Sequence, residues 1–187
     1  MPAAATPTTS PTSGPLLARL VNAILLRRAF YEAAAADPAA TGPAAAMVGL
    51  AALAREIPTL YDISETSAIW GLAAFAIFVI ALLGWVAYSA VAYVIARLIA
   101  PAPVELKRVL RCLGYAETVT VLRLLARPLD PAYYLPLHVA LIAWTLYAVF
   151  VAMRAATAAR GPRLWMIVLL VFVAQQAVLA IEPLLAY

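Results

Sequence analysis

A long uncharged segment constrains this chain more than any other feature. No charged residue stands between Glu65 and Arg97. An α-helix rises about 1.5 Å per residue, so this segment is long enough to cross a hydrocarbon core of roughly 30 Å. Only a helix satisfies its own backbone in lipid, and Trp70 and Tyr93 stand near the two ends, where aromatic rings favour the headgroup region. The pattern predicts a transmembrane helix over 67–98; the alternative is a buried helix of a soluble protein.

The composition is typical of a membrane protein with one compact domain. Of the 187 residues, 66% are hydrophobic and 12% are charged, against about 25% charged in soluble domains. No basic run is interleaved with aromatic residues, so we expect no nucleic acid partner despite the net charge of +4. The lone Cys112 excludes an internal disulfide, and with His138 it is too few for a usual metal site. The alanine and arginine content suggests a bacterial protein.

The N-terminal residues are predicted to stay outside the membrane core. Residues 1–14 are rich in Pro, Ala, Thr and Ser, so we expect a disordered tail. Residues 15–37 repeat leucine and isoleucine at helical spacing, with Arg19, Arg27 and Arg28 beside them. This pattern predicts an amphipathic helix lying in the membrane interface, and packing of the same helix on the bundle or on a partner is equally compatible. The Asp-Pro pair at its end terminates the helix.

The rest of the chain, 38–187, is predicted to form an all-α, polytopic transmembrane helical bundle. Its spans are expected at about 39–57, 67–98, 110–127, 133–154 and 163–182. The first of these is poor in large side chains, so it needs neighbouring helices for support. The third is short, and the residues leave open whether it is a buried span or a re-entrant helix.

The distribution of basic residues predicts the orientation in the membrane. With five spans, ten of the 13 basic residues fall on the N-terminal side and three on the other. A four-span alternative, with residues 97–132 all cytoplasmic, gives nine against four. Because cytoplasmic loops carry the excess of Lys and Arg, both place the N-terminus in the cytoplasm. The five-span arrangement, which is weakly preferred, puts the C-terminus outside the bacterial inner membrane.

Three stretches resemble the Yip1-domain family of membrane proteins. The central stretch ARLIAPAPVELKRVLRCLGYAETVTVLRLLA is similar to a family pattern in which a basic helix leads into an "lR.lGyA" element. The stretch AWTLYAVFVAMRAATAARGPRLWMIVLLVFV resembles the later spans, and RRAFYEAAAADPAA resembles the helix before the membrane. The resemblance covers about residues 25–185. It departs at Glu117, Thr118 and Val119, where the family often has a proline.

The resemblance implies a five-span helical bundle with a cytoplasmic N-terminus. Eukaryotic relatives act in vesicle traffic and contact small GTPases, but bacterial members have no such pathway, so a GTPase partner is not expected here. The family supplies no catalytic residues to transfer.

Four basic residues form the candidate surface for a partner or for lipid: Arg97, Lys107, Arg108 and Arg111. All fall on the predicted cytoplasmic side, and Lys107 and Arg111 share a helix face. Anionic headgroups or an acidic partner loop would suit such a cluster. The alternative is that these residues only set the orientation of the chain.

Polar residues at membrane depth are the second candidate site. They are Glu117, Arg123, Gln175 and Gln176. Such groups are costly in lipid and usually face the bundle interior, although residues near segment ends can extend to the interface instead. Glu117 and Arg123 are six positions apart and do not share a helix face, whereas Gln175 and Gln176 are suited to hydrogen bonds between helices. His138 is expected at the interface.

The sequence favours a protein that works by binding partners. It has no HExxH pair, no GxSG loop, no EExxxR motif and no phosphate-binding loop, so we expect neither an enzyme nor a cofactor. The prediction is a scaffold or accessory subunit of a larger inner-membrane complex, with membrane lipids and other membrane subunits as partners and a homo-oligomer also compatible. The alternative is a small-solute or ion transporter, although the strong spans hold few polar residues and no internal repeat.

Overall fold

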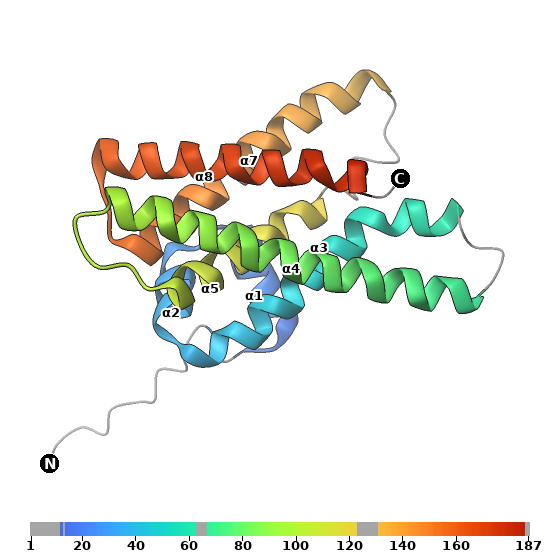
Figure 1. The fold of residues 1–187 in the computed structure, drawn as a ribbon, viewed down its shortest axis with the longest axis horizontal. Helices are drawn as coiled ribbons and strands as arrows, with labels where there is room; N and C mark the ends of the chain where they lie inside the picture. The colour runs from blue at the N-terminus through green and yellow to red at the C-terminus, as the bar shows by residue number, and fades with distance from the viewer. Residues whose placement is uncertain (1–11, 13, 63–66, 123–130, 186–187) are drawn as a thin grey trace, which may run out of the picture.

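The computed structural model describes residue 12 and the ranges 14–62, 67–122 and 131–185 (Figure 1). These ranges contain seven α-helices, two short 3₁₀ helices and no strand, as the sequence predicts for an all-α chain. The predicted tail over 1–14 lies almost entirely outside the described residues.

Four long helices make up most of the molecule (Figure 1). They are α3 (Thr41–Asp62), α4 (Ser67–Ile99), α7 (Pro131–Thr157) and α8 (Gly161–Leu185). Two of them, α4 and α8, run along its long axis, and the other two, α3 and α7, are inclined to it (Figure 1). α4 packs against α3 on one side and α8 on the other, and α8 also packs against α7. Each helix covers one predicted span to within a few residues, except that α3 runs five residues beyond the predicted end at 57.

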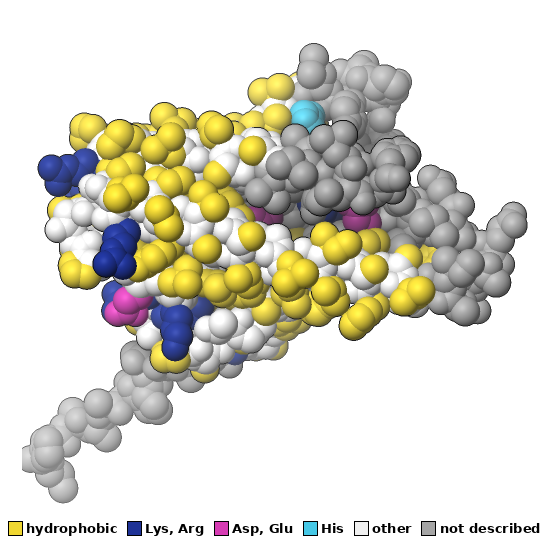
Figure 2. Space-filling view, in the orientation of Figure 1, with side chains coloured by type: hydrophobic (Ala, Val, Ile, Leu, Met, Phe, Trp, Pro, Cys, Tyr) yellow, Lys and Arg dark blue, Asp and Glu magenta, His cyan; other side chains and the backbone are white. Residues whose placement is uncertain are grey.

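The surface of α4 decides between a membrane and a soluble core. Only 6% of its most apolar window is buried, and large apolar side chains such as Leu72, Phe75 and Leu83 are exposed. A core helix of a soluble protein would bury these side chains, whereas lipid accommodates them. Figure 2 shows hydrophobic side chains along this surface and basic side chains gathered at one end.

Two helices in the described ranges are long and apolar enough to cross a membrane, judged by length and composition. They are Trp70–Ile99, within α4, and Pro136–Thr157, within α7. Within α8 (Gly161–Leu185), the segment Gly161–Ala177 is apolar over the residues whose side chains are described, and α3 is less apolar than α4. The number of spans therefore stays a prediction.

Helix α5 (Leu106–Ala116) lies at the centre of the fold. It packs against α2, α3, α4 and α7, and its buried side chains include Val109, Leu113 and Tyr115. Gly114 allows this close packing, because a Cβ atom there would lie only 3.0 Å from the Cβ of Ala44 and from Cζ2 of Trp85. Glycine is thus required by a close approach of three helices.

The predicted span at about 110–127 changes its helix type partway along the described residues. The α-helix ends at Ala116 and continues as the 3₁₀ helix η2 (Glu117–Leu122); residues 123–127 lie outside the described residues. The hydroxyls of Thr118 and Thr120 donate to the carbonyl oxygens of Tyr115 and Glu117, three residues earlier, at 2.7 Å each. Such side-chain bonds compete with the regular helix pattern and favour the tighter turn.

The predicted helix over 15–37 is divided in two. α1 (Leu16–Ile24) and α2 (Arg28–Ala36) are separated by Leu26, whose φ of 53° is left-handed and interrupts the helix. The side chain of Leu26 is buried, and the Tyr31 hydroxyl donates to the carbonyl oxygen of Ala23 at 3.2 Å, so packing and hydrogen bonding stabilise the break.

The two N-terminal helices present different faces. α2 buries Phe30 and Tyr31 against the bundle, next to α5 and α7. α1 exposes Leu17, Val21 and Leu25. Packing on the bundle therefore holds for α2, whereas the outward apolar face of α1 suits the membrane interface. The chain enters α3 through the 3₁₀ helix η1 (Pro38–Ala40), whose first turn is capped by the Asp37 carboxylate at 2.9 Å from the Ala39 N–H.

Candidate functional site: a polar cavity inside the bundle

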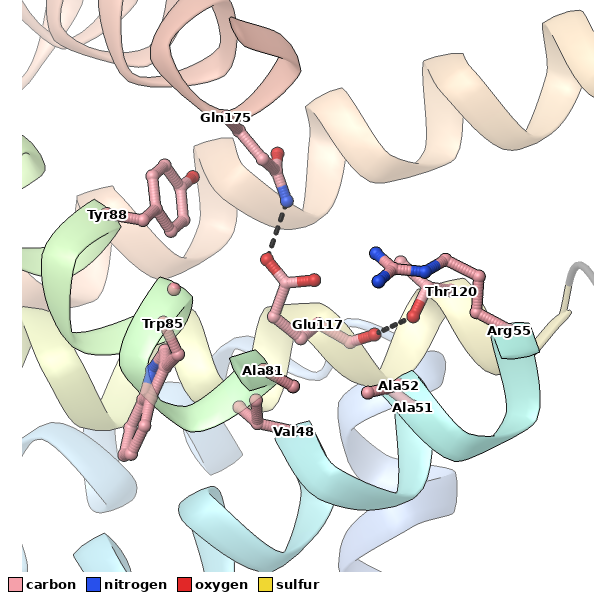
Figure 3. Close-up of a pocket in the computed structure, with 11 residues that line it drawn as sticks. Val48, Ala51, Ala52, Arg55, Ala81, Trp85, Tyr88, Glu117, Thr120 and Gln175 are labelled. Atoms are coloured by element: carbon pink, nitrogen blue, oxygen red, sulfur yellow. Dashed lines mark hydrogen bonds between the residues drawn. The ribbon is translucent and has the colours of Figure 1, made fainter. Parts of the chain in front are cut away.

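A small cavity of about 60 Å³ lies between α3, α4, η2 and α8 (Figure 3). Its walls are partly small and apolar, from Val48, Ala51 and Ala52 of α3 and Ala81 of α4. The polar side chains that complete the lining come from all four elements and are Arg55, Tyr88, Glu117, Thr120 and Gln175. Polar groups from four elements thus converge on one half-open cavity of an otherwise apolar bundle.

Glu117 is the anionic group of the cavity. Because it is the first residue of η2, the change from α-helix to 3₁₀ helix sets where its carboxylate points. The side-chain N–H of Gln175 donates to Glu117 Oε1 at 2.6 Å (Figure 3). This bond connects α8 to η2 across 58 residues of sequence, the kind of interhelical link that the sequence predicts for Gln175.

Arg55 supplies the positive charge. Its Nε lies 2.9 Å from Oε1 of Glu56, and its side chain is 25% exposed. In Figure 3 the guanidinium group points into the region between Glu117 and Thr120. The cavity therefore contains both signs of charge, which lowers the cost of holding either in apolar surroundings.

Two buried polar atoms in the cavity wall lack a hydrogen-bond partner within the described part of the chain. They are the hydroxyl oxygen of Tyr88, a residue 4% exposed, and Oε1 of Gln175, a residue 6% exposed. The Oγ of Ser89, next to Tyr88 in α4, is also buried without a partner there. These atoms offer acceptors and donors to a small guest.

Tyr88 is not among the residues predicted from the sequence, although the spacing of residues in α4 indicates it. Trp85, Tyr88, Ser89, Ala92 and Ala96 recur at spacings of three and four within α4, and all are buried. Bulky lipid-facing residues do not interrupt this row. Polar side chains on the face with the smallest residues therefore mark the side of a transmembrane helix that packs inward.

Three of the four predicted contact residues lie on the surface. Arg97, Lys107 and Arg108 are exposed around the turn between α4 and α5. Arg97 donates to the Tyr93 hydroxyl at 2.8 Å, and Arg108 lies 3.3 Å from the Glu105 carboxylate. Figure 2 shows basic side chains at this end of the molecule.

Arg111 departs from the prediction, because it is buried and cannot contact a headgroup or a partner. It lies one turn beyond Lys107, where α5 has entered the bundle, and its guanidinium donates to the carbonyl oxygen of Ala35. That oxygen is among the last of α2, where carbonyls lack helical partners and the helix dipole favours a cation. Lys107 and Arg111 both belong to α5, four positions apart, but the sequence does not show that α5 enters the bundle between them.

Two other predicted polar residues, Gln176 and His138, are half-buried and are not among the described residues that line the cavity. The predicted residue Arg123 lies outside the described residues. Among the described residues, no three His, Cys, Asp or Glu side chains are grouped so that they could hold a metal ion.

These features define an α-helical membrane protein with an outward apolar surface, one basic end and a polar internal cavity. The model of the Yip1 domain matches residues 22–181, so the chain belongs to the Yip1-domain family. The match includes all three stretches on which the resemblance rests. No curated protein and no solved structure matched the chain.

Proposed function

We propose that the protein is a non-enzymatic scaffold or accessory subunit of a larger complex in the bacterial inner membrane. It contacts its partners through a basic edge, defined as Arg97, Lys107 and Arg108, at the turn between α4 and α5. An acidic partner loop or anionic headgroups complement this edge, at roughly 1 kcal/mol per basic residue near an anionic surface.

The observation that carries the proposal is the groove beside the basic edge. It has a volume of about 440 Å³ and is lined by Tyr93, Arg97, Ala100, Ala102, Pro103 and Val104. Pro101 and Pro103 end α4 and turn the chain sharply, while buried Val104 fixes the turn to the core. A cationic, concave and rigid surface at the end of a bundle suits binding better than catalysis.

The internal cavity argues against the transport of organic solutes. Ligand pockets usually measure about 300–1,000 Å³, whereas this cavity measures about 60 Å³. If the protein is a transporter, its substrates are therefore ions or protons. The observation that supports this alternative is that Arg55, Glu117 and Gln175 converge on the cavity.

The proposed orientation has five spans, the N-terminus in the cytoplasm and the C-terminus outside. The turns at the ends of α4 and α7 carry the basic residues Arg97, Lys107, Arg108, Arg154, Arg160 and Arg163, and basic side chains gather at one end of the molecule in Figure 2. A common basic end supports a common cytoplasmic side.

The proposal is tested by native mass measurement after purification in mild detergent, with the full chain and a double reversal, Lys107→Glu with Arg108→Glu. The matched control reverses two exposed basic residues: Arg160, between α7 and α8, and Arg163, in the first turn of α8. We expect a co-purifying membrane subunit that the first reversal releases and the control retains, with weaker association at high salt. Recovery of the unmodified chain only as a lone homo-oligomer would contradict the proposal and favour transport.

A further inference from the structure

The cavity between α3, α4, η2 and α8 is large enough for water. A water molecule needs roughly 10–15 Å³ of a volume measured in this way, and the cavity measures about 60 Å³. The cavity therefore has room for more than one water molecule, and polar side chains line part of its walls. Empty cavities of this size in proteins are apolar, and this one is not.

The partners are the unpaired atoms of Tyr88 and Gln175. Leaving a buried polar atom without a hydrogen bond costs about 1–3 kcal/mol. Both atoms belong to side chains more than nine-tenths buried, and both side chains line the cavity beside Glu117 (Figure 3). Water in the cavity would form hydrogen bonds with both atoms, and the entropy lost when a water molecule is immobilised costs little.

We propose that the cavity binds a cluster of ordered water molecules that exchange a proton with Glu117, so that it forms a proton-binding site inside the bundle. A hydrated proton in the cluster transfers to a carboxylate oxygen: one O–H bond breaks on water and one forms on Glu117. No oxidant, reductant or further reactant is needed. This site is separate from the basic edge and does not depend on the proposed scaffold function.

The surroundings of Glu117 favour its two forms in opposite ways. The guanidinium of Arg55 and the amide N–H of Gln175 stabilise the carboxylate, whereas the apolar walls stabilise the neutral acid. When protonated, Glu117 gains an O–H donor, which can donate to the cavity waters; the free Oε1 of Gln175 points away from Glu117 (Figure 3) and is open to the same waters.

Other ionisable groups belong to the elements packed on this site. The described charged and titratable side chains, by element, are Arg19 in α1; Arg28, Tyr31 and Glu32 in α2; Arg55 and Glu56 in α3; Tyr88, Tyr93 and Arg97 in α4; Lys107, Arg108, Arg111, Cys112 and Tyr115 in α5; His138, Tyr147 and Arg154 in α7; and Arg163 in α8. Of these, Arg55 and Tyr88 line the cavity. The carboxylate of Glu117 is the group that accepts the proton.

The test is infrared difference spectroscopy on the full chain in lipid nanodiscs, between alkaline and acidic pH. We expect the C=O stretch of a protonated carboxylic acid to appear on acidification and to be lost in Glu117→Gln. Gln175→Leu should shift the frequency of this band and the pH at which it reaches half its intensity. Gln176→Leu, which removes the neighbouring amide on the same helix, should leave both unchanged. Exchange into H₂¹⁸O should shift an O–H stretch of bound water that Tyr88→Phe weakens.

Two results would overturn the proposal. If the wild type and Glu117→Gln give the same difference spectrum across the pH range, Glu117 does not take up a proton. If no water band responds to H₂¹⁸O, the cavity is dry. Should Glu117→Gln fail to fold, the paired Gln175→Leu and Gln176→Leu variants decide, because both keep the carboxylate: equal spectra for the two variants reject the site.

Discussion

The indole N–H of Trp85 donates to the carbonyl oxygen of Leu110 at 3.1 Å, which connects α4 to the central helix α5. The same indole approaches Gly114, one turn further along α5. A single aromatic side chain thus fixes both the position of α5 along α4 and its distance from it.

Replacing Trp85 by Phe should lower the free energy of unfolding by about 0.5–1.5 kcal/mol for the lost hydrogen bond, plus a packing loss. Trp165→Phe is the matched control, because Trp165 is half exposed and rests on Phe150 at the surface. Its effect should stay within about 0.5 kcal/mol. Thermal unfolding in detergent, followed by circular dichroism, measures both variants; equal losses would mean that the bond to Leu110 does not stabilise the fold.

Gly114→Ala should destabilise the protein although alanine is the better helix former. The gain in helix propensity is about 1 kcal/mol. Against it, the new methyl would press on the Cβ of Ala44 and the ring of Trp85, and overpacking costs about 1–3 kcal/mol. Gly71→Ala in α4 is the control, since a Cβ there meets no atom within 4 Å. We expect a lower melting temperature for Gly114→Ala only; an unchanged or higher value would refute the close contact.

Arg111→Met should be more harmful than Arg108→Met. The first leaves the carbonyl oxygen of Ala35 buried without its donor, which costs about 1–3 kcal/mol. The second removes an exposed pair with Glu105, worth about 0–1 kcal/mol. Limited proteolysis within α2 is the readout, because release of Arg111 should expose this helix. Equal cleavage rates in the two variants would argue against a docking role for Arg111.

Alkaline pH should weaken the docking of α2. Burial raises the pKa of the Tyr31 hydroxyl well above its ordinary value, and nearby Cys112 and Glu117 raise it further. In the unfolded chain the tyrosine ionises near pH 10, so the folded state holds this proton where the unfolded state has lost it. The stability contribution is therefore complete below about pH 10 and is lost as the pH rises above it. Unfolding measured at increasing pH should fall less steeply for Tyr31→Phe; parallel curves would exclude Tyr31 as the cause.

A reporter active only outside the cytoplasm, fused after Tyr187, should be active. The reason is the split of ten basic residues against three between the two sides of a five-span chain. Deleting residues 1–14 should leave insertion unchanged. A silent fusion in a stably inserted chain would support four spans and a cytoplasmic C-terminus.

The sequence predicts the long helices well because their signal is local. The absence of charge between Glu65 and Arg97, and the apolar run that includes Trp144, set where α4 and α7 lie to within a few residues. Length and hydropathy suffice for that, and the predicted resemblance to the Yip1-domain family is confirmed.

The features that escape prediction depend on contacts between distant segments. Leu26 breaks the N-terminal helix because its side chain is buried in the core. The neighbouring residues in the sequence do not indicate this burial. Arg111 looks like its exposed neighbour Arg108 until α2 is placed beside it. The sequence predicts both Gln175 and Glu117 as intramembrane polar residues, but their pairing and the role of Tyr88 emerge only when α4, α8 and η2 come together.

The bond from Arg111 to Ala35 also sets an order of events during synthesis. These residues are 76 positions apart, and Tyr115 and Ala40, joined at 3.5 Å, are 75 apart. At about 5–20 residues per second, the ribosome completes α2 roughly 4–15 s before it makes the arginine that holds it. During that interval the N-terminal helices have no finished bundle to dock on. The insertion machinery therefore receives α3 and α4 first, and the N-terminal pair closes over α5 afterwards.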